Sequence, residues 1–555
     1  MRFFYAIGLI CFVFLIHTAA WSTELEGPVD ITREPILSFE WASYIQDGDL
    51  YVKTMGFPPL MIRSAQEAKA SVQSPDIKIK GDSVFIAWIE KGPKGSRLMF
   101  TSIRNKDKPL PKPLELTAKT KATKAKIFTS GKGKLYVLEI FQGNKPEVFI
   151  NLSSDNGKTF KRVLIDTEGV EALFNPSPVV IDNTLYVFFS GTSQGKSYLG
   201  MKAYEFPSLK IKESAEIKET GGSSFIEAFS VRNRPVAVYK TAYKGKFMLN
   251  SVVKGDKGWE VFSFKEAEGL DVARMDYYAW KDGKILAVFS GEERGKFKQR
   301  IYAAVSKDEG RSWEVKRIDS RKFDNTRSWL PRMAVDGDRV AVVWEDSRNI
   351  RSGIRMKLSP DRGNTWLKRD IPVSGSKLYA FRPRISSEGG NIYLTWHQYR
   401  TDEKRDADTV MAKHTWQEAF KMADEKEKVI SPEEKKKLLV ESVKSYWEGM
   451  INKDFKTTYE LHDPFYRARI QFDYYSSRRG PMVYHKHEIN DVTIRGNEAI
   501  VKSTVNYEIP KFRIMGRESS MPPRDFPIED IWLFIDGKWY RKFVDALSEG
   551  SAIKY

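Results

Sequence analysis

The sequence predicts an all-β propeller followed by a smaller α+β domain in which helices pack against a curved, cone-shaped sheet. Three observations lead to this multidomain fold class. A short strand pattern recurs about every fifty residues between positions 80 and 400. A sharper turn motif recurs in register with that pattern. Beyond Trp416 the pattern changes to amphipathic helices and then to long alternating strands.

Each repeat unit is a turn rich in Gly, Asp or Asn followed by an alternating apolar strand that usually ends in an aromatic residue. The units end at Trp88, Glu139, Phe189, Tyr239, Phe289, Trp344 and Trp396. A period of about fifty residues with short strands and no helical pattern is typical of a β-propeller. Seven visible units predict seven blades, or six if one unit is an insertion. Residues 36–64 have strand character without the repeat, and we expect them to complete the last blade.

The turn motif reads SSDNGKTF at 153–160, SKDEGRSW at 306–313 and SPDRGNTW at 359–366. In such a turn an Asp carboxylate accepts backbone N–H groups, a Gly takes a positive φ and an aromatic ring packs inward. We therefore expect structural roles for Asp155, Gly157, Phe160, Asp308, Gly310, Trp313, Asp361, Gly363 and Trp366. Calcium ligation or acid catalysis by these carboxylates is disfavoured, because no second carboxylate cluster accompanies each one.

At these motifs the chain resembles the Asp-box, or bacterial neuraminidase repeat, propellers of the sialidase superfamily. The resemblance covers roughly residues 35–420. It implies the propeller fold, with a domain that we bound at 21–420. That superfamily includes sialidases, other hydrolases, and sugar-binding and adhesion proteins, so the fold alone does not fix a function.

Three consecutive units place an arginine where the first strand of a blade begins: Arg274, Arg332 and Arg384. The resemblance implies an arginine triad that binds the carboxylate of the substrate, a task for which the planar guanidinium is well suited. In the segment YAFRPRI, Arg382 is the alternative to Arg384 as the inward residue. We expect these four arginines to bind a ligand.

A retaining sialidase needs an acid/base carboxylate and a tyrosine nucleophile. Glu345 or Asp346 could supply the acid, and the tyrosine candidates are Tyr277, Tyr278 and Tyr399. The family places a catalytic Asp in an early blade, close after its first arginine. No equivalent stands near Arg33 or Arg63, which weighs against catalysis, and the sequence leaves open whether the protein is an enzyme.

The C-terminal region, residues 431–555, begins with an amphipathic helix. Ser431 is the expected N-cap, Pro432 the first helical residue and Glu434 the capping-box partner. Residues 421–430 are the expected linker. The order of helices and strands resembles the nuclear transport factor-like (SnoaL-like) cone fold, over residues 431–548.

The chain of 555 residues carries 91 Lys and Arg against 73 Asp and Glu, a formal charge of +18 that favours anionic partners. We recognise no nucleic-acid-binding module, so nucleic acid is not an expected partner. Cys11 is the single cysteine, which excludes disulfides and Cys-bound metals in a chain cleaved after it. No metal and no cofactor is expected.

Residues 1–20 read as a cleaved secretory signal, with one Arg, an apolar run and small residues at its end. The apolar run is shorter than the roughly 20 residues of a spanning helix, so we expect no stable membrane span after cleavage. The predicted location is exported, either periplasmic or extracellular.

Three functional hypotheses follow. The first is a noncatalytic propeller that binds an anionic glycan or another envelope component through its arginines. The second is an exo-sialidase-like glycoside hydrolase that uses the same face, and the third is a protein-interaction scaffold. The sequence leaves the ligand and the oligomeric state undetermined.

Overall fold

The structure is a computed structural model. Residues 1–35, which include the predicted signal peptide 1–20, and residues 543–555 lie outside the described residues. The structure describes residues 36–542 except for 39–40, 55–57, 94, 105–109, 117–121, 130–133, 142–146, 166–169, 206–207, 209, 220–222, 244–245, 294–298, 321–326, 350, 376–378, 400–406, 425–429, 464–465, 468–469, 480, 515–516 and 536.

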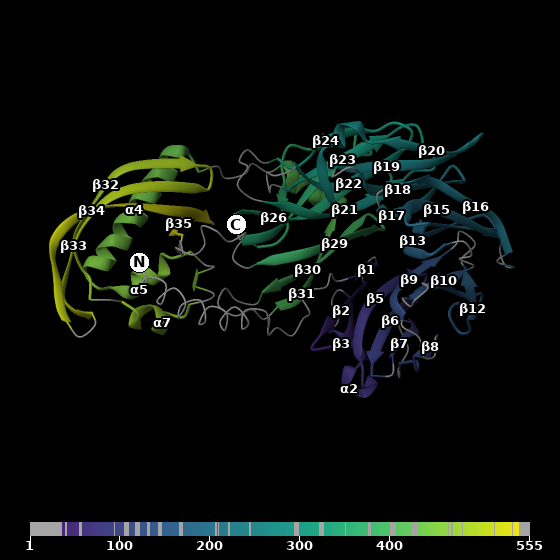
Figure 1. Cartoon of the computed structure of the whole chain (residues 1–555), viewed down its shortest axis with the longest axis horizontal. Helices are drawn as coiled ribbons and strands as arrows, with labels where there is room; N and C mark the ends of the chain where they lie inside the picture. Colours follow the sequence, from purple (N-terminus) through teal and green to yellow (C-terminus); the bar gives the residue numbers. More distant parts are fainter. Residues whose placement is uncertain are drawn as a thin grey trace.

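The repeat region folds into seven consecutive antiparallel sheets, each of which we call a blade and name by its first and last strand (Figure 1). Among the described residues six blades have four strands, the last has three, and strand order follows the chain. The first four blades comprise β5 (Ser71–Lys80), β6 (Ser83–Gly92), β7 (Gly95–Arg104), β8 (Leu114–Glu115), β9 (Ala122–Thr129), β10 (Leu135–Phe141), β11 (Glu147–Ser153), β12 (Lys161–Ile165), β13 (Ala172–Ile181), β14 (Thr184–Ser193), β15 (Lys196–Glu205), β16 (Lys210–Glu219), β17 (Ser223–Val231), β18 (Arg234–Tyr243), β19 (Lys246–Gly255) and β20 (Gly258–Ser263).

The remaining three blades follow a short 3-10 helix at Lys265–Ala267. They comprise β21 (Leu270–Ala279), β22 (Ile285–Glu293), β23 (Gln299–Ser306), β24 (Glu314–Arg317), β25 (Ser328–Asp336), β26 (Arg339–Asn349), β27 (Arg351–Ser359), β28 (Ile371–Pro372), β29 (Ala380–Glu388), β30 (Asn391–Tyr399) and β31 (Ala407–Thr415).

The second strand of each blade is the one that the sequence repeat marks. Such a strand lies between its own sheet partners and the two neighbouring blades, so both of its faces are buried. In β26, residues 340–344 are all 0% exposed. This burial explains why the repeat reads as a run of apolar residues that ends in a large aromatic one.

The segment predicted to complete the last blade forms a sheet of its own. Strands β1 (Ile36–Ser38), β2 (Trp41–Gln46), β3 (Asp49–Thr54) and β4 (Leu60–Arg63) pair with one another and not with β31, and helix α2 (Ala65–Ala68) follows them. The predicted count of seven or six blades is therefore not confirmed. The ring has one sheet more than the repeat has units.

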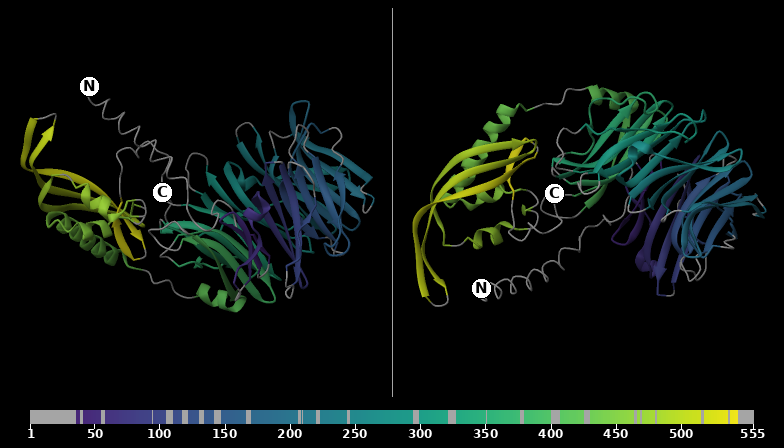
Figure 2. Two further views of the ribbon diagram at one scale, coloured as in Figure 1. Left: turned by 90° about the horizontal axis from the view of Figure 1, so that it is seen from below. Right: turned by 45° about the horizontal axis from the view of Figure 1, so that its top comes forward.

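The N-terminal sheet closes the ring. Strand β1 contacts both β29 of the last blade and β5 of the first repeat blade. Lys53 Nζ donates to the carbonyl oxygen of Thr409, 356 residues away, at 3.4 Å. A non-repeating sheet thus joins the two ends of the repeat array, and the views from two sides show the blades fanning around one centre (Figure 2).

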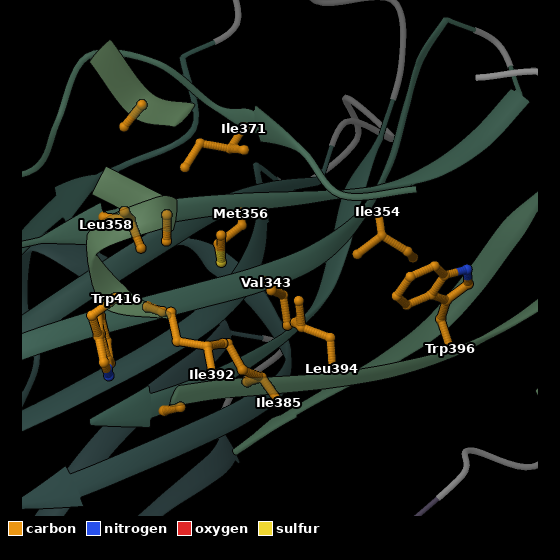
Figure 3. Close-up of a cluster of buried hydrophobic side chains, with 14 of the residues drawn as sticks. Val343, Ile354, Met356, Leu358, Ile371, Ile385, Ile392, Leu394, Trp396 and Trp416 are labelled. Atoms are coloured by element: carbon orange, nitrogen blue, oxygen red, sulfur yellow. The ribbon is translucent and has the colours of Figure 1, made fainter. Parts of the chain in front are cut away.

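Hydrophobic clusters fill the spaces between neighbouring blades. Figure 3 shows the cluster between the last two, where Val343, Ile354 and Met356 of one blade meet Ile392 and Leu394 of the next. Further clusters of this kind join successive blades from β2 to β26. Side-chain packing between the sheets therefore holds neighbouring blades together.

The three turn motifs share one hydrogen-bond pattern, illustrated by the second. Asp308 Oδ1 accepts from Ser306 Oγ at 2.8 Å and from Ser312 N at 2.8 Å, and Oδ2 accepts from Ser312 Oγ at 2.6 Å. Gly310 has φ +95° and donates its N–H to Ser306 Oγ at 2.8 Å. Trp313 packs into the cluster between two blades.

The other two turns repeat this arrangement around Asp155 and Asp361, with equivalent bonds between 2.6 and 3.0 Å. Gly157 and Gly363 have φ of +82° and +83°. Phe160 and Trp366 are packed against interblade clusters. The carboxylates are thus saturated by their own turns.

Helix α3 (Trp416–Asp424) follows the last blade and covers the first four residues of the predicted linker. The α+β domain contains helices α4 (Pro432–Ile451), α5 (Phe455–Glu460) and α7 (Phe472–Ser477). Its antiparallel sheet is formed by β32 (Val483–Arg495), β33 (Glu498–Ile514), β34 (Arg517–Ile535) and β35 (Lys538–Arg541).

The start of α4 has the predicted capping. Ser431 Oγ accepts the N–H of Glu434 at 3.0 Å, and Pro432 occupies the first turn. The buried face of α4, including Leu439, Val443 and Trp447, packs against the sheet in one hydrophobic cluster. No helix among the described residues is long and apolar enough to cross a membrane.

Candidate functional site: the arginine face of the propeller

The first strands of five blades carry a β-bulge with one non-glycine residue at positive φ. These residues are Ser74, Asn175, Arg274, Leu330 and Arg382, with φ between 48° and 56°. A bulge re-aims a side chain and is common beside functional sites. The bulges lie toward the end of the blade at which the first strand begins, and they mark the mouth of the central channel.

The first strand of all seven blades shifts register, and one residue from the regular part that follows in each strand belongs to a tier around the channel. Its members face equivalent positions of the second strands and are Asp76, Lys126, Ser177, Glu227, Asp276, Arg332 and Arg384. We call this set the channel tier. It contains three cations, three carboxylates and one serine, and the two arginines stand in neighbouring blades.

Members of the channel tier reach from one blade to the next. Asp76 Oδ2 accepts Ile127 N–H at 2.7 Å, and Asp276 Oδ2 accepts Met333 N–H at 2.9 Å. Lys126 and Glu227, two blades apart, approach to 3.5 Å. The tier therefore links several of the first strands to one another as well as lining the channel.

The predicted arginine triad is split between the two levels. Arg332 and Arg384 belong to the channel tier, whereas Arg274 and Arg382 are bulge residues above it. In the blade of Arg274, the tier position is occupied by Asp276. Burial raises the pKa of Asp276, and the charges of Arg332 and Arg384 and the Met333 N–H oppose that rise.

Arg274 differs from the other three arginines in its surroundings. It is exposed, and its guanidinium has no ion pair or hydrogen bond within the part of the chain that the structure describes. Arg332, by contrast, is half-buried and donates from Nη1 to the carbonyl oxygen of Pro331 at 3.2 Å. A cation that is exposed and unpaired at a channel mouth is available to an anionic ligand.

Glu345 is a buried carboxyl between the last two blades. Its oxygens accept Ser352 Oγ–H at 2.7 Å and the backbone N–H of Arg382 at 3.1 Å. Burial raises the pKa of Glu345, and these two bonds, with one from the Trp329 side chain, oppose the rise. Glu345 is thus the predicted acid that lies directly beside an arginine of the mouth.

Asp346 has a structural environment. It accepts Ser328 Oγ–H, the Trp344 indole N–H and the Arg348 guanidinium, each at 2.9 Å. The same arrangement, an indole N–H that donates to the side chain two residues later, recurs at two other blades. Those pairs are Trp88 with Glu90 and Trp396 with Gln398, each at 3.2 Å. Asp346 therefore belongs to a repeated stabilising feature of the blades.

The three predicted tyrosines lie in different places. Tyr277 packs into an interblade cluster against Phe229, and burial raises its pKa well above the ordinary value. Tyr278 is 42% exposed and packs edge-on against Trp280. Tyr399 is half-buried at the mouth, edge-on to Tyr379 and Phe381. Tyr277 and Tyr278 are neighbours in β21, whereas Tyr399 belongs to another blade.

A hollow of about 210 Å³ opens on the channel wall between β17 and β21, and its lining includes Glu227, Asp276, Tyr277 and Tyr278. It thus contains two carboxylates of the channel tier. Across the described ranges no three His, Cys, Asp or Glu side chains gather closely enough to hold a metal ion.

Sequence reasoning missed the carboxylates of the channel tier, although a signal for them exists. Four of the bulges contain a proline directly after the positive-φ residue or within the bulge: Ser-Pro-Asp at 74–76, Asn-Pro-Ser at 175–177, Leu-Pro-Arg at 330–332 and Arg-Pro-Arg at 382–384. A proline inside a strand marks a bulge. The recurrence of these prolines in the repeat frame predicts the residue after each one as a tier position.

No protein-family model matches this chain, and no curated protein matches it. Solved structures of enzymes that act on glycans are similar to it in fold. An ulvan lyase of polysaccharide lyase family PL25 is 12% identical and covers 60% of this chain and 93% of its own, with a TM-score of 0.42. The NanB sialidase from Streptococcus pneumoniae is 9% identical, covers 67% and 89%, and has a TM-score of 0.32. The intramolecular trans-sialidase from Ruminococcus gnavus is 10% identical, covers 63% and 96%, and has a TM-score of 0.34.

Proposed function

We propose that the protein binds an acidic glycan, or another anionic component of a cell envelope, at the arginine face of its propeller and does not cleave it. The arginine face consists of Arg274, Arg332, Arg382 and Arg384. The observation that carries the proposal is Arg274, which is exposed at the channel mouth and has no partner among the described residues. A guanidinium in that position can hold a carboxylate or sulfate through two hydrogen bonds.

The bonding of the carboxyl groups supports binding without turnover. Asp276 accepts two backbone N–H groups, from Tyr277 and Met333, and Asp346 is surrounded by donors. A general acid must be free to approach the glycosidic oxygen. Tyr277, whose pKa is raised, is the opposite of an activated nucleophile.

Glu345 keeps a sialidase-like glycoside hydrolase as the second candidate function. Its raised pKa means that the carboxyl keeps its proton to a higher pH, as a general acid must. It also lies next to Arg382. This candidate still needs a nucleophile, for which Tyr399 at the mouth is the half-exposed option.

The test of the proposal is a binding measurement with sialyllactose, and with lactose as the neutral probe. We expect the intact chain to bind sialyllactose and not lactose. Arg274→Ala should weaken binding about tenfold or more, as the loss of a charged hydrogen bond predicts. Arg232→Ala is the matched control, because Arg232 is exposed on the opposite face and pairs with Glu309. Equal binding by both variants, or no binding by the intact chain to any acidic glycan on an array, overturns the proposal.

Hydrolysis of a fluorogenic sialoside separates the two candidates. We expect no release by the intact chain. Release that Glu345→Gln abolishes, in a variant that still binds sialyllactose, would establish the hydrolase instead. Export by the signal 1–20 and the nuclear transport factor-like character of the α+β domain belong to the same proposal.

A further inference from the structure

The α+β domain contacts the propeller through Asn497, which lies in the turn between β32 and β33. Its Nδ2 donates to the carbonyl oxygen of Arg348 at 2.9 Å. Arg348 is at the end of β26, and 149 residues separate the two positions. The bond therefore joins the two domains.

The side-chain amide of Asn497 can point in only one direction. Lys435 Nζ, from the first turns of α4, donates to Asn497 Oδ1 at 2.9 Å and to the Gly496 carbonyl oxygen at 3.1 Å. An ammonium group only donates and a carbonyl oxygen only accepts, so Nδ2 must face the propeller. The carbonyl oxygen of Asn497 accepts the N–H of Phe534 at 2.8 Å, which fixes the backbone of the turn.

The acceptor on the propeller, the carbonyl oxygen of Arg348, is also fixed by hydrogen bonds of its own residue. The N–H of Arg348 donates to Asp346 Oδ1 at 2.8 Å, and its guanidinium bonds to Asp346 and also to Asp370 Oδ2 at 2.6 Å. Both carboxylates are buried, and Lys357 Nζ adds a bond to Asp370 at 2.8 Å. The position of the Arg348 carbonyl is therefore set before the domains meet.

The contact lies on the side of the propeller that carries the arginine face. Arg348 follows Glu345 by three residues, and Ser347 next to it is bonded to Arg327 at the start of the same blade. The turn motifs around Asp308 and Asp361 lie at the opposite strand ends. Figure 1 shows the α+β domain beside the ends of β26 and β30.

We propose that Asn497 is a positioning residue that docks the α+β domain on the arginine side of the propeller, so that the channel mouth is bounded by both domains. The Asn497 amide and the Arg348 carbonyl group are each held in position by bonds within their own domain, and they form one hydrogen bond of defined direction. Such preparation lowers the entropic cost of docking. This inference does not depend on what ligand the arginine face binds.

The experiment measures the distance between the domains in the full chain by double electron–electron resonance. Cys11 is the single native cysteine and is replaced by Ser, so that labels attach only to Glu388→Cys in the propeller and Lys486→Cys in the α+β domain. Both positions are exposed. We expect one narrow distance distribution for this labelled parent.

The decisive variant is Asn497→Asp, which can still accept from Lys435 but cannot donate to Arg348. The matched control is Asn490→Asp, whose amide donates at 2.9 Å to Thr504 within the sheet of the α+β domain. We expect a broadened or shifted distribution for Asn497→Asp, an unchanged one for Asn490→Asp, and unchanged unfolding temperatures for both.

Asn497→Ala removes the donor without adding a charge, and it decides the matter if the Asp variant fails to fold. A broadened distribution in Asn497→Ala supports the docking role. A distribution that stays as narrow as the parent's in both folded Asn497 variants overturns it.

Discussion

The two faces of the propeller are built in different ways. On the face of the turn motifs, Asp155, Asp308 and Asp361 make the same hydrogen bonds three times, each inside its own turn. On the arginine face the backbone repeats, with a register shift in all seven first strands and a described positive-φ residue in five of them, but the side chains differ from blade to blade. Serine, asparagine, leucine and arginine all occupy the positive-φ position.

This difference separates the positions of the repeat that stabilise the fold from those that are available for binding. Where residue identity recurs, a local turn requires it, because only particular side chains satisfy the backbone. Where the backbone recurs and the side chain varies, the bulge fixes the backbone conformation without requiring a particular side chain. The residues of the arginine face can therefore vary without loss of the fold, as residues of a binding site must.

Asp346 tests whether residues close to the arginine face also serve the stability of the blades. Asp346→Ala leaves the Arg348 guanidinium partly uncompensated in a buried site, which should cost about 3 kcal/mol of unfolding free energy. Urea denaturation measures it, with Asp346→Asn as a milder control. A loss below about 1 kcal/mol would contradict the structural assignment.

Gly157 and Gly310 of the turn motifs differ in the space available to a side chain. Both have positive φ, but a Cβ at Gly157 meets the buried Phe100 ring at 2.7 Å, whereas at Gly310 the nearest atom lies at 3.5 Å. Gly310→Ala should cost about 1–2 kcal/mol for the left-handed backbone alone. Gly157→Ala should cost about 1–3 kcal/mol more because of the clash. Equal losses in thermal or urea unfolding would show that Phe100 moves aside freely.

The turn carboxylates should also make the stability of the protein depend on pH. Partial burial acts to raise the pKa of Asp361, but bonds from Thr365 and Ser359 outweigh it and the pKa is lowered. A lowered pKa contributes stability above the unfolded value near 4, and this contribution is lost as the pH falls through the folded value. The destabilisation caused by Asp361→Asn should therefore be largest at pH 7 and shrink below about pH 4. A difference between the two proteins that stays constant from pH 7 to pH 3 would rule this out.

Arg274 gives the smallest expected change in stability. Because its guanidinium is exposed and has no partner among the described residues, Arg274→Ala should alter the unfolding free energy by less than about 0.5 kcal/mol. The same variant is the one that should lose acidic-glycan binding. A decrease of more than about 1 kcal/mol in the unfolding free energy, measured with urea, would instead assign Arg274 a role in stability.

The sequence predicts best what a local motif encodes. The turn bonds of Asp308 and the cap at Ser431 follow from a few neighbouring residues, and the run of apolar residues at 340–344 identifies a strand buried on both faces. The role of Asp276 escaped, because it depends on the bulge at Arg274, a shift of register that no alternation pattern records. The separate N-terminal sheet escaped because it has no repeat.

Candidate site residues could be named but not sorted from the sequence. Glu345 and Asp346 are neighbours in a strand and so point to opposite faces of their blade. One meets the backbone of Arg382, and the other meets the indole of Trp344. Only the packing of the neighbouring blades assigns these different surroundings.

The closure of the ring by β1–β4 bears on the order in which the protein can assemble during synthesis. The first strands to be made need β29 and β31 as neighbours, and Lys53 must wait for Thr409. Contacts so distant along the chain form slowly. For most of translation the nascent propeller is thus an incomplete ring, in which the N-terminal sheet and the last completed blade each lack a neighbour. Protection of these two exposed faces until the last blade is synthesised therefore determines how much of the protein reaches its closed form.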